Sequence, residues 1–349
     1  MLTTAHPTAD PPPTAAARRP RAARQALLLG LGLALLLLCL ALSLALGSRS
    51  VPLPTVLRAL LGTGRHDDPG VQVVTGLRVP RTVLGLVVGA ALGAAGAVAQ
   101  GATRNPLASP TTLGVNAGAS FAVVTAIYAL HLDQPVQYVW FAVAGAALAA
   151  CAAHAMARRT GDLDPTRLAL GGTVLAAVLT SWTSALMLAS RRTLDEARFW
   201  LVGSLDGRGL DVLTPVLPLL LVGLLLALAV APALNALALG DEAAQALGVP
   251  VARIRVAAGL AVVLLAAAAV AVAGPIAFVG LAAPHLCRVL LGDDHRLLLP
   301  GCLIGGPILL LTADVLGRLV VRPAELEVGI VTAFLGAPLL AVLARRATR

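Results

Sequence analysis

Residues 78–101 read RVPRTVLGLVVGAALGAAGAVAQG, and this stretch decides the class of the fold. After Arg81 it continues for about 20 residues without a charge, the length that a helix needs to cross the hydrocarbon core of a bilayer. Gly85, Gly89 and Gly93 recur every four residues and therefore share one helix face. Glycine at this spacing allows two helix backbones to approach closely in a membrane. We expect a transmembrane helix that is buried among its neighbours.

The composition extends this pattern to the whole chain of 349 residues. Apolar residues make up 58% and charged residues 12%, about half the charged share of a soluble protein. All 26 basic residues are arginine, because the sequence contains no lysine. A P-loop nucleotide site needs a lysine on the phosphates, so any ATP hydrolysis would belong to another chain. With aromatic residues at 3%, the net charge of +9 indicates membrane topology and no nucleic-acid partner.

The hydropathy pattern predicts an all-α polytopic membrane protein with about ten transmembrane helices. The expected spans are 27–47, 78–101, 111–130, 136–157, 167–190, 211–232, 251–273, 275–292, 297–318 and 327–345. We expect one transmembrane domain over 27–349, preceded by a Pro-rich disordered tail over 1–26. An even number of spans places both termini on one side. The larger share of the arginines falls on that side, which predicts cytoplasmic termini.

Two groups of charged residues lie near the predicted outer ends of spans. Arg78 and Arg81 flank a Val-Pro pair; they either extend to lipid headgroups or bind the carboxylates of an acidic partner. Asp314 and Arg318 lie one helical turn apart, so we expect them to form an ion pair within the membrane. That pairing would still allow Arg318 to face a partner outside.

Three further segments are unusual for simple connections between spans. The polar stretch 100–120 is interrupted by glycine and proline, which favours a loop that lines or closes a water path. Residues 239–248 predict a compact helix, with acidic residues in its first turn and Gly248 at its end. Residues 274–288 contain two prolines, and His285 and Arg288 share a helix face near the inner boundary.

Together with residues 327–338, these segments resemble the FecCD-type permease subunits of ABC importers for ferric siderophores, haem and cobalamin. The resemblance runs from about residue 27 to the C-terminus. It implies the type II ABC importer permease fold, with two permease subunits around one pathway. It also implies cytoplasmic ATP-binding subunits and an extracytoplasmic substrate-binding protein as partners.

The resemblance assigns roles to particular residues. It implies that Arg78, Arg81 and Arg318 dock the binding protein. The residues implied to contact the ATPase are Leu239, Gly240, Glu242, Ala243, Ala244, Leu247 and Gly248. The residues implied to line or gate the pathway are Gln100, Asn105, Pro106, Leu107, Asn116, Asp164, Pro165, Gly274, Pro275, His285 and Arg288. It implies no catalytic residue, metal ligand or cofactor.

We therefore expect a multi-pass permease of the cytoplasmic membrane that is not itself an enzyme. Its expected cargo is a ferric siderophore complex, with haem and cobalamin as alternatives. A secondary transporter driven by an ion or proton gradient is an alternative of a different class. Such a transporter would need a carboxylate inside the membrane, and Asp314 is the candidate for it.

Overall fold

The fold was determined as a computed structural model, which describes residues 15–65, 67–159, 162–163 and 165–347. The α-helices are α1 (Ala15–Ala45), α2 (Leu53–Leu60), α3 (Pro69–Val73), α4 (Val79–Thr103), α5 (Val115–Leu130), α6 (Pro135–Ala157), α7 (Pro165–Ala189), α8 (Arg191–Val202), α9 (Leu217–Leu237), α10 (Asp241–Ala246), α11 (Val251–Ala273), α12 (Val279–Leu291), α13 (His295–Val320) and α14 (Val328–Ala347). Shorter helical turns cover Val74–Arg78, Pro110–Leu113, Leu210–Val212 and Thr214–Val216. Two short antiparallel strands, β1 (Arg158–Arg159) and β2 (Asp162–Leu163), join α6 to α7.

Ten apolar helices occupy the positions of the ten predicted spans. Within the described part of the chain, seven stretches are long and apolar enough to cross a membrane: Ala22–Ala45, Pro69–Thr103, Pro135–Ala157, Leu170–Ala189, Leu210–Leu237, Val251–Ala273 and His295–Val320. α5, α12 and the apolar part of α14 are shorter. The predicted all-α transmembrane fold is confirmed.

Four helix starts differ from the prediction by four residues or more. α5 and α9 begin four and six residues later than predicted, because the short helical turns Pro110–Leu113, Leu210–Val212 and Thr214–Val216 precede them. α12 begins at Val279 rather than at residue 275, because residues 274–277 are non-helical and Phe278 has a positive φ. α1 begins at Ala15, inside the segment predicted as a disordered tail. Its first turns are rich in alanine and arginine, which are strong helix formers, so the helix extends beyond the membrane span. Residues 1–14 lie outside the described part of the chain.

α4 lies at the centre of the bundle, as its glycine pattern predicts. A Cβ atom added at Gly89 would lie 2.6 Å from Cα of Pro307 in α13. At Gly93 it would lie 2.5 Å from the carbonyl oxygen of Cys302, and at Gly96 it would overlap the carbonyl of Gly280 in α12. The glycine face therefore permits direct backbone contact with α12 and α13, and the prediction of a buried helix is confirmed.

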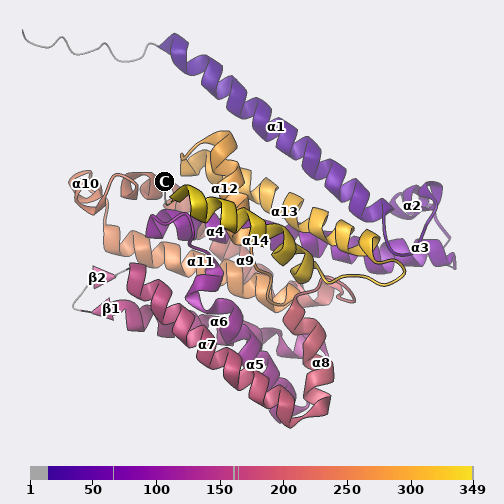
Figure 1. The fold of residues 1–349 in the computed structure, drawn as a ribbon. Coiled ribbons are helices and arrows are strands. Elements are labelled where there is room, and N and C mark those ends of the chain that lie inside the picture. Colours follow the sequence, from indigo (N-terminus) through magenta and orange to yellow (C-terminus); the bar gives the residue numbers. More distant parts are fainter. Residues whose placement is uncertain (1–14, 66, 160–161, 164, 348–349) are drawn as a thin grey trace, which may run out of the picture.

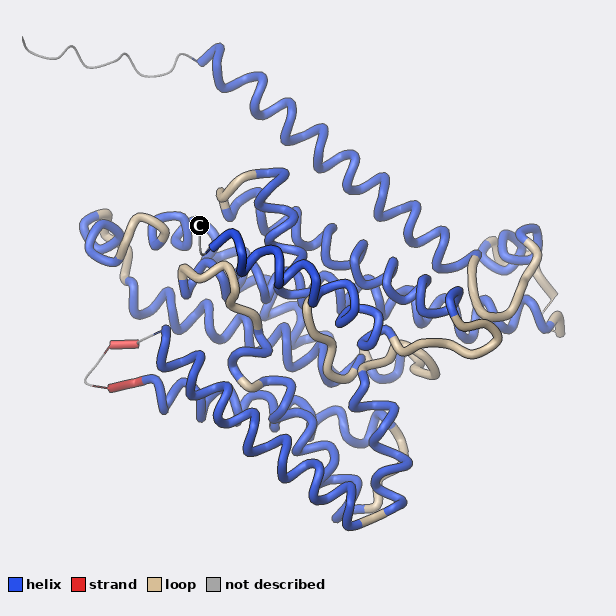
Figure 2. The backbone as a smooth tube through the Cα atoms, in the orientation of Figure 1, coloured by secondary structure: helices blue, strands red, loops and turns tan. Residues whose placement is uncertain are grey.

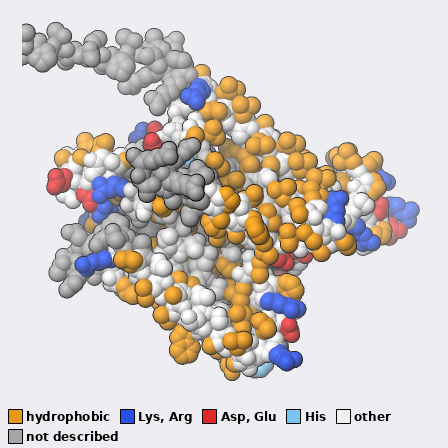
Figure 3. All heavy atoms as spheres, viewed as in Figure 1, with side chains coloured by type: hydrophobic (Ala, Val, Ile, Leu, Met, Phe, Trp, Pro, Cys, Tyr) orange, Lys and Arg blue, Asp and Glu red, His pale blue; other side chains and the backbone are white. Residues whose placement is uncertain are grey.

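The connections gather at two opposite ends of the bundle (Figure 1). One end, called the α10 end, carries α10, both strands and the C-terminal end of α14. The other, called the α2 end, carries α2 and α3, and α1 runs between the two ends. Figure 2 shows helices along the whole bundle, with β1 and β2 at the α10 end. In Figure 3 hydrophobic side chains cover the middle of the molecule and charged side chains gather toward its ends, the distribution expected for a protein that crosses a bilayer.

Candidate functional site

Arg78 lies at the α2 end and is tied to the end of α1. Its guanidinium donates hydrogen bonds to the carbonyl oxygens of Leu44 (2.9 Å), Ala45 (2.7 Å) and Arg49 (2.6 Å). The side chain is buried. The carbonyls of Leu44 and Ala45 belong to the last turn of α1, where backbone acceptors lack partners within the helix, and Arg49 follows that turn. Arg78, which directly precedes α4, therefore supplies hydrogen-bond donors to the carbonyl groups at the C-terminal end of α1.

Arg81 and Arg318 share one buried carboxylate. Arg81 donates from Nε (2.9 Å) and Nη2 (2.8 Å) to Oδ1 of Asp314, and Arg318 donates from Nη2 to Oδ2 at 2.6 Å. Asp314 is completely buried, and the predicted Asp314–Arg318 pair is confirmed. Arg318 also donates to the hydroxyl of Ser43 (2.8 Å). This Arg81–Asp314–Arg318 triad joins α4 and α13 to α1.

The solvent side of Arg81 meets two further carboxylates. Its Nη1 lies 2.6 Å from Oε2 of Glu325 and 2.8 Å from Oδ1 of Asp206. Burial would raise the pKa of Glu325, but a hydrogen bond from Ser48 and the charge of Arg81 together bring that pKa below its ordinary value. The Asp206 side chain is 58% exposed. Arg81 therefore extends from a buried acid to acids at the surface.

The three arginines predicted to dock a partner thus lie together, but all three are buried and bound within the chain. The sequence predicted the Asp314–Arg318 pair, but it could not reveal the other contacts, because those acceptors come from residues that are remote along the chain. Asp206 and Glu325 were missed for the same reason. In sequence they are isolated charges in connecting segments, and only the fold brings them to Arg81.

α10 is the compact helix predicted over 239–248, with narrower bounds. Gly240 precedes it with φ 107°, and Gly248 follows it with φ 79°; both are left-handed conformations that glycine adopts without strain. Leu239 and Leu247 are exposed at its two ends, and Glu242 is exposed in its first turn.

The opposite face of α10 packs on the chain itself. Ala244 is completely buried and Ala243 is half-buried. Ala244 therefore cannot contact another protein as the sequence predicted, because a short helix that lies on a surface has one face covered. The exposed part of α10 is formed by its ends and its acidic first turn.

Asp241 connects α10 to two neighbouring segments. Its carboxylate lies 3.2 Å from Nη2 of Arg104, the residue that ends α4, and 2.9 Å from Nη2 of Arg255 in α11. None of these three residues was predicted to make this contact, because they come from three separate segments of the chain. The two ion pairs link α10 to the central helix and to α11.

Several predicted gate residues lie at the α10 end. Gln100 is buried, and its Oε1 accepts a hydrogen bond from Nη1 of Arg288 at 3.0 Å. Asn105, Pro106 and Leu107 form an exposed turn, in which Oδ1 of Asn105 accepts from the backbone N–H of Leu107 at 2.9 Å. These residues are close to Arg104 in the chain, so the loop and α10 share one attachment point.

Asn116 lines a separate cavity of about 400 Å³ between α5, α7 and α8. Most of its polar side chains are hydroxyls, and the residues that line it are Thr111, Asn116, Ala117, Ser120, Ala176, Thr180, Thr183, Ser184, Met187 and Leu201. Hydroxyl and amide groups offer donors and acceptors without fixed charge. Such a cavity can hold water or a large polar solute without binding it tightly.

Gly274, Pro275 and His285 do not line this cavity. Gly274 ends α11 with φ 73°, and a Cβ atom there would overlap the carbonyl of Trp200 in α8. Pro275 lies beside it and packs its carbonyl against Gly203. His285 is half-buried in α12. Asp164 lies outside the described residues, and Pro165 begins α7.

Comparison with known proteins finds relatives that match most of the chain. The profile of the FecCD transport family matches residues 35–346. The chain is 46% identical over 304 residues to the ferric enterobactin transport system permease protein FepD of Escherichia coli, covering 87% of this chain and 90% of the relative. It is 41% identical over 286 residues to the Fe(3+) dicitrate transport system permease protein FecD of the same organism, covering 82% and 89%.

A solved structure of a metal-chelate type ABC transporter in an inward-facing conformation has the same fold. It matches with a TM-score of 0.79 and 30% identity, over 91% of this chain and 99% of that chain. Because the family profile covers most of the sequence and the helices match a transporter over nearly its whole length, this chain belongs to the FecCD transport family.

Proposed function

We propose that this chain is the membrane-spanning permease subunit of an ATP-driven importer and that it moves ferric siderophore complexes across the cytoplasmic membrane. The names of its relatives support this cargo: one carries ferric enterobactin and another Fe(3+) dicitrate. The chain performs no chemistry on the cargo. ATP is hydrolysed by partner subunits, which act through the surface of this chain.

The observation that carries the proposal is the attachment of α10. Its exposed Leu239, Leu247 and Glu242 offer apolar and acidic contacts to a cytoplasmic ATPase. Its inner side is fixed through Asp241 to Arg104 and Arg255. A displacement of α10 would therefore reach the loop after α4 and the start of α11. In this proposal the α10 end is cytoplasmic and both termini lie on that side.

A second permease subunit would complete the pathway. Four apolar side chains of α7 are exposed at a spacing of four residues: Leu170, Val174, Val178 and Trp182. That spacing places them on one helix face without a partner inside this chain. The hydroxyl-lined cavity also borders α7. A second subunit packed on this face would lie across α7 from the cavity, because the residues of α7 that line the cavity are on the opposite side of the helix. The cavity lining has few fixed charges, which suits a large cargo that must also leave.

A substrate-binding protein would dock at the α2 end. We place its contact around Arg81, where Asp206 and Glu325 cover the guanidinium from the solvent side. Acidic residues of the partner would take the place of these two carboxylates. Arg78 and Arg318 would then act by holding Arg81 and α1 in position rather than by direct contact.

Two alternatives concern the cargo and the energy source. A cobalamin import system permease of Halobacterium salinarum is 40% identical over 275 residues, so cobalamin and haem belong in the same assay. A proton-coupled mechanism is disfavoured because Asp314 lies between Arg81 and Arg318. Without the charge of that carboxylate, Arg81 would retain Asp206 and Glu325, but Arg318 would be a buried charge with only neutral hydrogen-bond acceptors.

The test is uptake in cells that express the chain together with its ATPase and binding protein. Ferric siderophore, ferric citrate, haem and cobalamin are supplied separately, and a protonophore arm distinguishes ATP from an ion gradient. Asp241→Asn should abolish most uptake, because α10 loses both anchors. The matched control is Asp195→Asn, which removes an exposed pair with Arg198 on α8. Full uptake by Asp241→Asn would contradict the proposed coupling, and uptake of none of the ferric cargoes would contradict the substrate class.

A further inference from the structure

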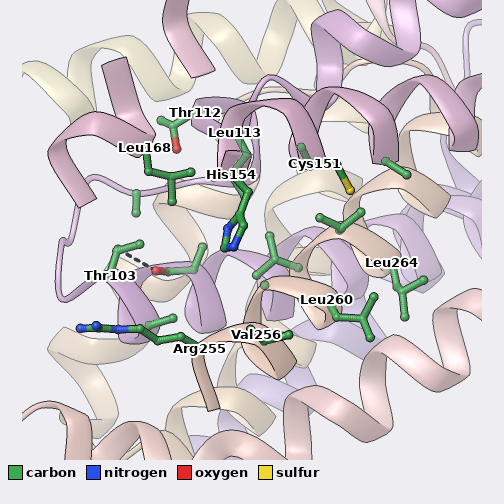
Figure 4. A pocket seen from close by; sticks show the side chains of 18 of the residues that line it. Thr103, Thr112, Leu113, Cys151, His154, Leu168, Arg255, Val256, Leu260 and Leu264 are labelled. Atoms are coloured by element: carbon green, nitrogen blue, oxygen red, sulfur yellow. Dashed lines mark hydrogen bonds between the residues drawn. The ribbon is translucent and has the colours of Figure 1, made fainter. Parts of the chain in front are cut away.

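A second cavity, of about 500 Å³, lies between α4, α6 and α11 at the α10 end (Figure 4). Its walls are almost entirely apolar: α4 and α6 contribute alanine side chains, and α11 contributes valine and leucine side chains. The polar residues that line it include Thr103, His154 and Arg255, and Figure 4 shows the His154 ring directed into the space. This groove is distinct from the hydroxyl-lined cavity at α5, α7 and α8.

The mouth of the groove opens sideways between two membrane-spanning helices. Its exposed residues are Cys151 and Ala155 of α6 and Val256 and Leu260 of α11. Leu260 lies nine residues after Val251, the start of α11, so the mouth extends about 14 Å from that end at 1.5 Å per residue. One leaflet contributes about 15 Å of hydrocarbon. The groove therefore opens toward the acyl chains of a single leaflet rather than toward water.

The end of the groove nearest to α10 carries positive charge. Arg255 lines it, with a side chain that is 17% exposed and one carboxylate partner, Asp241. Arg167 is exposed in the first turn of α7, next to Leu168, which lines the groove. These cations lie at the depth where the phosphates of lipid headgroups are found.

A second copy of the chain would not cover this groove through the free face of α7. Leu168 lines the groove, whereas Leu170 belongs to the exposed face. Two residues apart on a helix are separated by about 200° of rotation, so these side chains point in nearly opposite directions. The groove and the surface proposed for the second permease subunit are therefore on different sides of α7.

We propose that an anionic phospholipid from the leaflet at the α10 end occupies this groove. One acyl chain fills the apolar space, and the phosphate lies beside Arg255. The apolar walls of the groove match an acyl chain, and the positive charge of Arg255 matches the lipid phosphate. The phosphate would compete with Asp241 for Arg255, so an occupied groove would loosen one of the two anchors of α10.

Native mass spectrometry of the purified full chain tests the proposal, with phosphatidylglycerol and phosphatidylcholine of identical acyl chains as probes. Gly259→Phe fills the groove, because a Cβ atom at Gly259 meets no atom within 4 Å. The control is Gly30→Phe, at another open glycine on α1 outside the groove. We expect phosphatidylglycerol to bind at least tenfold more tightly than phosphatidylcholine, and Gly259→Phe but not Gly30→Phe to remove the tight adduct.

A second pair of variants tests the headgroup contact. Arg255→Gln should reduce the preference for phosphatidylglycerol, whereas Arg192→Gln, which removes a surface pair with Glu196 on α8, should preserve it. Equal binding of the two lipids, or an adduct that persists in Gly259→Phe, would overturn the proposal. Binding of glycerophosphoglycerol without acyl chains as tightly as the lipid would also overturn it, as would loss of a dimer instead of a lipid in Gly259→Phe.

Discussion

Removal of the charge of Asp314 tests how the α2 end is held together. Asp314→Asn keeps the size of the side chain but removes the negative charge between Arg81 and Arg318. Arg81 retains Asp206 and Glu325. Arg318 retains only neutral acceptors, the hydroxyl of Ser43 and two backbone carbonyls. The cost therefore arises mainly at Arg318.

The expected magnitude follows from the burial of the three groups. The side chains of Arg81, Arg318 and Asp314 are 7%, 2% and 0% exposed. Removal of one partner from a buried ion pair costs about 3–5 kcal/mol, because the charge left behind stays desolvated. We expect a loss in this range for the variant. The double variant Asp314→Asn with Arg318→Gln should be more stable than Asp314→Asn alone, because it removes the uncompensated cation.

Equilibrium unfolding of the detergent-purified chain, titrated with SDS and followed by circular dichroism, measures the loss. Asp67→Asn is the matched control, because Asp67 pairs with Arg65 at the surface and both side chains are more than two-thirds exposed. An exposed pair contributes little to stability. A free energy for Asp314→Asn within about 0.5 kcal/mol of the wild type, well below the cost of a broken buried pair, would refute the reasoning. A double variant less stable than the single variant would also refute it.

Three other perturbations test the packing, the start of α13 and the surface of α10. Gly89→Ala should destabilise the chain by about 1–3 kcal/mol, because the new methyl group would clash with the backbone of α13. The control Gly76→Ala, at an open position, should not destabilise it. Thermal unfolding of the two variants measures the difference. Asp294→Ala should cost about 0.5–2 kcal/mol as a lost N-cap. The hydrogen bond from the backbone N–H of Arg296 lowers the pKa of Asp294 in the folded chain. The stability difference between wild type and variant should therefore be full above pH 4–5 and should shrink as pH falls below the unfolded pKa of about 3.9 toward the lower folded pKa. Melting curves from pH 7 to 3 would reveal or exclude this trend. Leu247→Glu should weaken capture of the partner ATPase in a pull-down, since Leu247 is exposed, and undiminished capture would remove it from the proposed contact.

The sequence was sufficient to predict the transmembrane helices and to predict that α4 is buried among its neighbours. A membrane span requires about 20 apolar residues, a local property, so the ten spans could be predicted to within a few residues. The glycine spacing of α4 is also local, and the structure confirms the close backbone contacts that it predicted. The exceptions are the starts of α1, α5, α9 and α12, because hydropathy marks an apolar segment but not the residue at which its α-helix begins.

The sequence by itself determined which residues cross the membrane and which short helix lies between α9 and α11. Only the tertiary structure decided what the charged residues do. Arg81, Asp314 and Arg318 lie more than 200 residues apart at their extremes, and Arg104, Asp241 and Arg255 come from three separate segments. A buried charge requires a partner, but the chain supplies that partner from any segment that folding brings close. Periodicity along the sequence does not indicate contacts between remote segments. The sequence pattern therefore identified the candidate docking arginines, and the structure showed that they are buried.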